Sequence, residues 1–108
     1  MKVFSLIALL MFSGFALAAD PVWIDVRTAG EFKSGHLEVA TNIPFGDVAE
    51  EVPALVSDKE APVYLYCRSG NRAGKAKKAL EAEGYTNVKN VGGLDDARAL
   101  YSEMNAAE

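Results

Sequence analysis

The sequence predicts one α/β domain: a small parallel sheet of about four strands with helices on both faces. Short runs rich in β-branched and aromatic residues alternate with stretches of good helix formers, a pattern typical of parallel sheets with crossover helices. The chain has 108 residues, 50% hydrophobic and 24% charged. That composition is ordinary for a globular protein, and the length allows one domain.

The first 18 residues differ from the rest and predict a signal peptide, which leaves a domain over 19–108. Lys2 precedes an almost wholly apolar run from Val3 to Phe15, and Ala16-Leu17-Ala18 forms a small-x-small cleavage pattern. A retained membrane anchor is the alternative, but the run is shorter than the ~20 residues that a span needs. We therefore expect export and no membrane association after cleavage.

The elements of the first half follow from apolar runs and their stops. Val22–Val26 is dense in β-formers and predicts the first strand, with Trp23 in the core. The stretch 27–33 predicts a loop and one helical turn. A second, short strand is expected over 40–43, stopped by Pro44, and then a helix over 46–52 that Pro53 interrupts, with room for a further turn through Leu55.

The second half repeats the alternation. Val63–Tyr66 predicts the third strand, because it is apolar and follows Pro62. The main helix is expected over 73–83, with Gly84 as the residue that ends it. A fourth strand over 87–91, a turn at Gly92-Gly93 and a final helix over 94–104 complete the domain.

The only cysteine, Cys67, stands between the third strand and the main helix. Backbone N–H groups at a helix start lack intrahelical partners and favour negative charge, and Arg68 and Arg72 add two cations. Such surroundings lower a thiol pKa from about 8.5 to roughly 3.5–7.5. A small buried apolar residue is the alternative role for Cys67, but two arginines and a glycine within five residues favour a reactive thiolate.

Composition excludes several other functions. After loss of Lys2, 10 basic and 15 acidic residues remain, a net charge of −5 that argues against nucleic acid or anionic lipid as a general partner. One cysteine can form no internal disulfide or dithiol pair, and with one histidine it cannot supply a structural zinc site. We expect no metal and no cofactor.

Four stretches of the chain carry a resemblance to a known family. I-D-V-R-T-A-G-E-F-K-S-G-H (24–36), N-I-P (42–44), Y-C-R-S-G-N-R-A (66–73) and G-Y-T-N-V (84–88) resemble a single-domain rhodanese, and the leader is similar to that of the periplasmic phage-shock rhodaneses. The resemblance implies a four-stranded sheet in the spatial order fourth-third-first-second. Two departures are the lack of room for an extra first strand and Glu38-Val39-Ala40 in place of an x-Gly-Ala connector.

The resemblance also implies an activity: a thiosulfate sulfurtransferase that moves a sulfane sulfur to cyanide or a thiol through a persulfide on Cys67. The loop Arg68, Ser69, Gly70, Asn71 and Arg72 would then bind the substrate, with Asp25 and Arg27 in support. Its partners would be small-molecule sulfur donors and acceptors, with a thiol protein as a further acceptor. A periplasmic persulfide carrier, or a stress-response interaction module with incidental activity, is the alternative.

Loop length separates this site from related anion loops. Cysteine phosphatases use Cys-x5-Arg, whereas Cys67 and Arg72 are separated by four residues. A Walker phosphate loop fails as well, because Ala76 stands where Ser or Thr is needed. Arg27 follows the first strand, so it is expected at the same edge of the sheet as the Cys67 loop, where it should pair with Glu31. Asp25 is expected to bind loop amides or Arg27. His36 is expected to be structural.

Overall fold

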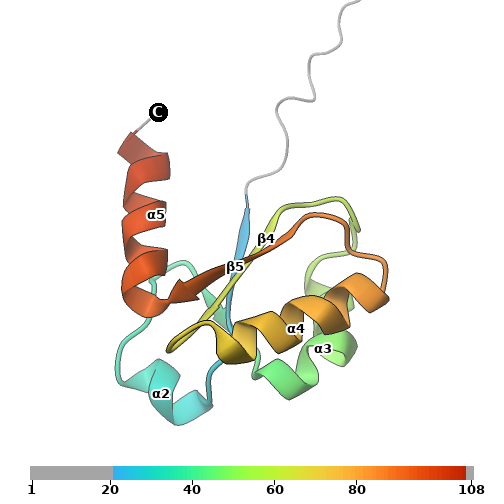
Figure 1. The fold of residues 1–108 in the computed structure, drawn as a ribbon, viewed down its shortest axis with the longest axis horizontal. Helices are drawn as coiled ribbons and strands as arrows, with labels where there is room; N and C mark the ends of the chain where they lie inside the picture. Colours follow the sequence, from blue (N-terminus) through green and yellow to red (C-terminus); the bar gives the residue numbers. More distant parts are fainter. Residues whose placement is uncertain (1–20, 107–108) are drawn as a thin grey trace, which may run out of the picture.

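Four parallel strands form one sheet in the computed structural model, which describes residues 21–106 (Figure 1). The strands are β2 (Val22–Asp25), β3 (Thr41–Asn42), β4 (Val63–Cys67) and β5 (Val88–Gly93), in the spatial order β3-β2-β4-β5. The predicted fold class and strand order are confirmed. The predicted signal peptide lies outside the described residues.

Helices cover both faces of this sheet. In Figure 1, α3 (Val48–Leu55) and α4 (Asn71–Ala82) lie together on one side, and α5 (Leu94–Ala106) stands apart from them. Two shorter elements, α2 (Ala29–Lys33) and the 3-10 turn η1 (Phe45–Asp47), follow the carboxyl ends of β2 and β3. No helix among residues 21–106 has the length and apolarity that a membrane crossing requires.

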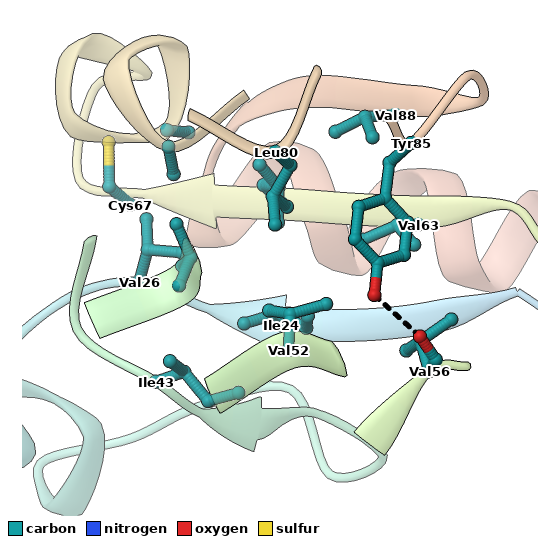
Figure 2. Close-up of a cluster of buried hydrophobic side chains, with 14 of the residues drawn as sticks. Ile24, Val26, Ile43, Val52, Val56, Val63, Cys67, Leu80, Tyr85 and Val88 are labelled. Carbon is teal, nitrogen blue, oxygen red and sulfur yellow. Dashed lines mark hydrogen bonds between the residues drawn. The ribbon is translucent and has the colours of Figure 1, made fainter. Parts of the chain in front are cut away.

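Strand alternation directs one set of side chains toward α3 and α4, and this set forms the larger core (Figure 2). Ile24 from β2 and Leu65 from β4 are completely buried there, as is Leu80 from α4. The Tyr85 hydroxyl, also buried, donates a 2.6 Å hydrogen bond to the Val56 carbonyl. The carbonyl at the end of α3 is thereby satisfied without water.

The opposite set of side chains packs against α5. Trp23 makes edge-on contacts with Tyr64 and Tyr101, with ring centroids 4.8 and 5.7 Å apart, and it is 4% exposed. Tyr66 belongs to this second cluster, whereas Cys67 belongs to the first. The predictions that Trp23 is a core residue and that Tyr66 points away from Cys67 are confirmed.

Two predicted boundaries in the helices are wrong. Pro53 does not interrupt α3, which runs on to Leu55. A proline there removes only one hydrogen bond near the helix end, and buried Val52 and Val56 hold the chain on either side of it. Helix α4 begins at Asn71 rather than at residue 73, because Gly70 takes the left-handed conformation and serves as its N-cap.

The predicted turn at Gly92-Gly93 is also wrong, since both residues end strand β5. Gly93 pairs with Cys67 across a register shift in the β4–β5 ladder. A side chain at Gly93 would collide with the Arg68 carbonyl, so glycine serves close approach here rather than chain reversal. The strand consequently lies directly beside the loop that follows Cys67.

Candidate active site

Cys67 is the last residue of β4, and its sulfur is enclosed by the loop that leads into α4. Its side chain is 1% exposed, and the Gly70 amide donates a 2.9 Å hydrogen bond to Sγ. Gly70 has φ +97°, a conformation that turns the backbone back over the sulfur and that side chains other than glycine rarely adopt. The thiol therefore faces a loop of backbone donors.

Opposing effects set the charge of this sulfur. Burial raises the pKa of Cys67. Hydrogen bonds from four backbone N–H groups lower that pKa, and together they outweigh burial, so the net shift is downward. The four donors are Ala73, Ser69, Gly70 and Arg72. Two of these four amides, those of Arg72 and Ala73, belong to the first turn of α4, where N–H groups have no helical partner, and Gly70 is the N-cap of that helix. The loop thus stabilises a thiolate, as predicted from its position.

A side chain from β5 braces this loop from outside. Asn90 donates a 2.8 Å hydrogen bond from Nδ2 to the Gly70 carbonyl, and its Oδ1 accepts one of 3.0 Å from the Gly92 amide. Asp96 accepts a further 2.8 Å bond from the Gly93 amide. The amide that reaches the sulfur and the carbonyl held by Asn90 belong to the same residue, Gly70, so β5 fixes its orientation.

A hollow of about 370 Å³ opens beside the loop, lined by Arg27, Arg68 and the start of α5. Arg68 is exposed, and no ion pair involves it within residues 21–106. Two acidic residues also line this hollow: Asp96 accepts a hydrogen bond from the Gly93 amide, and the exposed Asp95 lies 3.5 Å from Arg98. Arg68 is therefore the exposed cation of a hollow that acidic side chains also line.

Arg27 is held by Asp25 rather than by Glu31, so the predicted Arg27–Glu31 pair is wrong. Both Asp25 oxygens accept from the Arg27 guanidinium, at 2.6–3.0 Å, and Asp25 is completely buried. The Asp25 hydrogen bonds also raise the pKa of Arg27. Asp25 was expected to bind either loop amides or Arg27. It binds Arg27, and it accepts from both the guanidinium and the backbone amide of that residue.

Glu31 instead makes a two-pronged ion pair with Arg72, at 2.8 and 3.0 Å. The same carboxylate completes a capping box with Thr28 at the start of α2, so it is already oriented when Arg72 reaches it. The Arg72 hydrogen bond is the largest cause of a Glu31 pKa lowered to about 2. The pKa of Arg72 is raised, first by Glu31 and also by the charge of Cys67.

The remaining predicted residues are placed more simply. Ser69 and Asn71 are exposed on the loop. His36 stacks on Phe32 with ring centroids 3.6 Å apart, and its Nδ1 lies 2.8 Å from the Phe32 carbonyl oxygen. These local contacts suit the structural role predicted for it. Within residues 21–106, no three side chains of the metal-ligating types cluster around one point.

Sequence reasoning missed Asn90, and it missed the role of Glu31 as the partner of Arg72. The Thr28-x-x-Glu31 spacing was a detectable capping-box signal, but it predicts the helix start and not the partner 41 residues away. For Asn90, the Asn-x-Gly spacing at the end of a strand was the available signal, since asparagine often bonds the amide two residues on.

With this geometry described, the comparisons with known proteins are decisive. The family model of the rhodanese-like domain matches residues 16–99. The chain belongs to the rhodanese-like family. The resemblance found in the sequence is thereby confirmed, and the Cys67 loop lies at the site where that resemblance was most specific.

Individual relatives agree. The chain is 40% identical over 91 residues to the thiosulfate sulfurtransferase PspE of Escherichia coli, covering 84% of this chain and 88% of that protein. The solved structure of a rhodanese with anions from E. coli superposes with a TM-score of 0.69 at 42% identity, over 71% of this chain and 91% of that one. A Pseudomonas aeruginosa thiosulfate sulfurtransferase matches at TM-score 0.67 and 28% identity, over 74% of this chain but 15% of its own.

The first prediction concerns the Glu31–Arg72 pair. In wild type the Glu31 pKa should be about 2, and in Arg72→Ala it should rise toward the ordinary 4.5. Since folding lowers this pKa, the stabilisation from the pair is complete above pH 4.5 and is lost as the pH falls toward 2. Carboxyl NMR titration gives the pKa. An unchanged Glu31 pKa in Arg72→Ala would show that Arg72 does not hold the carboxylate.

The second prediction concerns the Asn90 brace. Asn90→Ala should leave the fold intact but raise the pKa of Cys67, because the Gly70 peptide loses its external support. The pH dependence of thiol alkylation measures that pKa directly. Lys89→Ala, at the neighbouring exposed position, serves as the matched control and should not move it. Equal alkylation profiles for Asn90→Ala and wild type would mean that the loop holds its amides without β5.

Proposed function

We propose that this protein is a thiosulfate sulfurtransferase that works through a persulfide on Cys67. The observation that carries the proposal is the buried Cys67 sulfur, whose negative charge is stabilised by backbone amides of its loop. Membership of the rhodanese-like family and the 40% identity to a thiosulfate sulfurtransferase support the same reaction. The loop explains chemically why that reaction suits these residues.

Thiosulfate is a dianion whose outer sulfur is the electrophile. The Cys67 thiolate attacks that sulfur, a new S–S bond forms, and the S–S bond of thiosulfate breaks with its electron pair leaving on sulfite. Cys67 then carries a terminal sulfur with one negative charge. Because the loop amides already stabilise an anion at Sγ, the curled backbone around Gly70 is suited to hold the persulfide anion as well.

The second half-reaction returns the enzyme to its resting state. A cyanide ion or a thiolate attacks the terminal sulfur, the persulfide S–S bond breaks, and its electrons return to Cys67. The products are thiocyanate or an acceptor persulfide. The cysteine leaves as a stabilised thiolate, so the same low pKa favours both half-reactions. No metal, cofactor or external redox reagent enters this balance.

The loop arginines have different roles in this proposal. Arg68 is exposed beside the hollow that Arg27 also lines, so it attracts the sulfonate end of thiosulfate. Arg72 is bound to Glu31 and lies within electrostatic reach of Cys67, so it fixes the loop and steadies the thiolate. Ser69, Gly70 and Asn71 contribute backbone donors, and the buried Asp25–Arg27 pair supports the floor of the site.

We also infer that the protein works in the periplasm after cleavage at residue 18. The leader pattern from Lys2 to Ala18 supports this location. Small sulfur donors and acceptors are the expected partners, and a protein thiol is a chemically equivalent acceptor.

The third prediction tests the nucleophile. Protein recovered from the periplasm is analysed by intact mass, which also tests leader cleavage: the mass should correspond to a chain that begins at Ala19. Treatment with thiosulfate should add the mass of one sulfur atom. Cyanide should remove it. Cys67→Ser should fold normally and gain no sulfur, since no other thiol exists. Sulfur transfer well above background in Cys67→Ser would exclude the persulfide mechanism, and a full-length mass would exclude cleavage.

The fourth prediction tests charge recognition by Arg68. Arg68→Ala should raise KM for thiosulfate about tenfold, as expected from a lost hydrogen bond to a charged group of roughly 1.5–3 kcal/mol. A neutral thiosulfonate ester should show a smaller change. The thiosulfate effect should shrink as salt rises, because exposed charges are screened over about 10 Å at 0.1 M.

Lys33→Ala removes an exposed cation from α2 and is the control for net charge. It should leave KM for both donors near the wild-type value. Equal losses on both donors in Arg68→Ala would assign that residue to the loop structure instead of to substrate charge.

A further inference from the structure

A shallow groove begins at the active-site loop and follows helix α4. Its first part is a hollow of about 310 Å³, lined by Gly70, Asn71, Gly74, Lys75 and Lys78. Two of these residues, Gly70 and Asn71, belong to the loop that encloses the Cys67 sulfur. The groove is therefore continuous with the site, but it is separate from the Arg27–Arg68 hollow.

The groove continues between α4 and β5. A second hollow, of about 540 Å³, shares Gly74 and Lys78 with the first and extends to Lys77 and Lys89. The two hollows together run from the loop along more than half of α4. We call this surface the α4–β5 groove.

A glycine inside the helix opens the groove. Gly74 lies in the second turn of α4, where glycine lowers helix stability and where no left-handed backbone requires it. A Cβ at this position would lie 3.5 Å from the Asn90 amide nitrogen, which is ordinary contact distance. Packing thus does not demand glycine here, and the surface depression is the consequence of its presence.

The groove is basic on an acidic protein. It contains four of the ten basic residues that follow the predicted leader, against a total of 15 acidic residues. Glu81 is the one acidic residue on its lining, and it lies 3.3 Å from Lys77. Lys75, Lys78 and Lys89 therefore give the groove a net positive charge.

An aromatic ring stands beside the first hollow. The Lys75 ammonium lies 5.8 Å from the centre of the Phe45 ring, and Phe45 is 37% exposed although it is large and apolar. Aromatic residues are enriched in protein interfaces and serve there as anchors. Small dianions would not need such a ring.

We propose that the α4–β5 groove docks an acidic segment of a protein whose thiol exchanges sulfur with Cys67. This inference rests on the proposed sulfurtransferase activity and names its macromolecular partner. The thiolate of the docked protein attacks the terminal sulfur of the Cys67 persulfide. The persulfide S–S bond then breaks, Cys67 leaves as thiolate, and the partner carries the sulfur.

Groove length sets where the acidic residues of the partner must lie. Lys78 is the eighth residue after Gly70, and eight helical steps correspond to about 12 Å. An extended chain covers that distance in roughly four residues. The acidic side chains of the partner should therefore lie within about four residues of the segment that carries its thiol. The groove lysines can then contact them while the thiol is at the Cys67 loop.

The test compares two acceptor peptides of equal length. Each peptide contains one cysteine and a run of four residues, which are glutamates in one peptide and glutamines in the other. One pair has this run before the cysteine, and a second pair has it after the cysteine. At low salt, persulfide-loaded wild type should transfer sulfur to the better glutamate peptide with about tenfold higher kcat/KM than to its glutamine counterpart. High salt should reduce this preference.

Matched charge reversals locate the effect. Lys78→Glu and Lys89→Glu should each lose most of the glutamate preference, whereas Lys33→Glu, with the same change in net charge on α2, should keep it. All three should transfer sulfur to neutral 2-mercaptoethanol as wild type does. Equal rates for both peptides in wild type, or an equal loss in Lys33→Glu, would overturn the proposal. Binding of phosphatidylglycerol vesicles through Lys78 without a peptide preference would also overturn it.

A binding measurement separates this inference from the activity on which it rests. Fluorescence anisotropy with the Cys67→Ser protein reports docking of labelled peptides without any sulfur chemistry. Tighter binding of the glutamate peptide, weakened by Lys78→Glu, supports the groove even if wild type forms no persulfide. Equal binding of the two peptides to Cys67→Ser would overturn the groove even if thiosulfate loads Cys67.

Discussion

A buried sulfur can carry negative charge only if donors replace the water that it has lost, and the site depends on meeting this requirement. The backbone of the Cys67 loop supplies them: the Gly70 amide lies 2.9 Å from Sγ, and N–H groups at the start of α4 add to it. The left-handed Gly70 makes that approach possible. Asn90 then holds the other side of Gly70, and Gly93 lets β5 come close enough to do so.

Two of the three arginines around this loop are held in ion pairs, and one is exposed. Arg27 is nearly buried and neutralised by Asp25, and Arg72 is bound through two hydrogen bonds to Glu31. If both were free, they would add strong positive charge but would also move on flexible side chains. The ion pairs hold both arginines in place, and Arg68 is left as the exposed guanidinium beside the sulfur.

Local patterns in the sequence were sufficient for the fold and for the position of the loop that encloses the Cys67 sulfur. Alternating strands and helices predicted the sheet, and the strand–Cys67–helix order predicted the loop and its lowered pKa. Pairings across the chain were not predictable in the same way. Glu31 is four residues from Arg27 but 41 from Arg72, and only the folded arrangement places it against the latter. Asn90 and Gly92-Gly93 were read as ordinary strand and turn residues because their contacts lie on another element.

The loop lies between two surfaces of different chemistry, and this has a consequence for how one sulfur can serve two kinds of reactant. On one side, Arg27 and Arg68 line a hollow in which Arg68 is the exposed cation. On the other, lysines and Phe45 border a longer and more open groove. In the proposed reaction, a donor bound at the first surface would leave the second surface open to an acceptor.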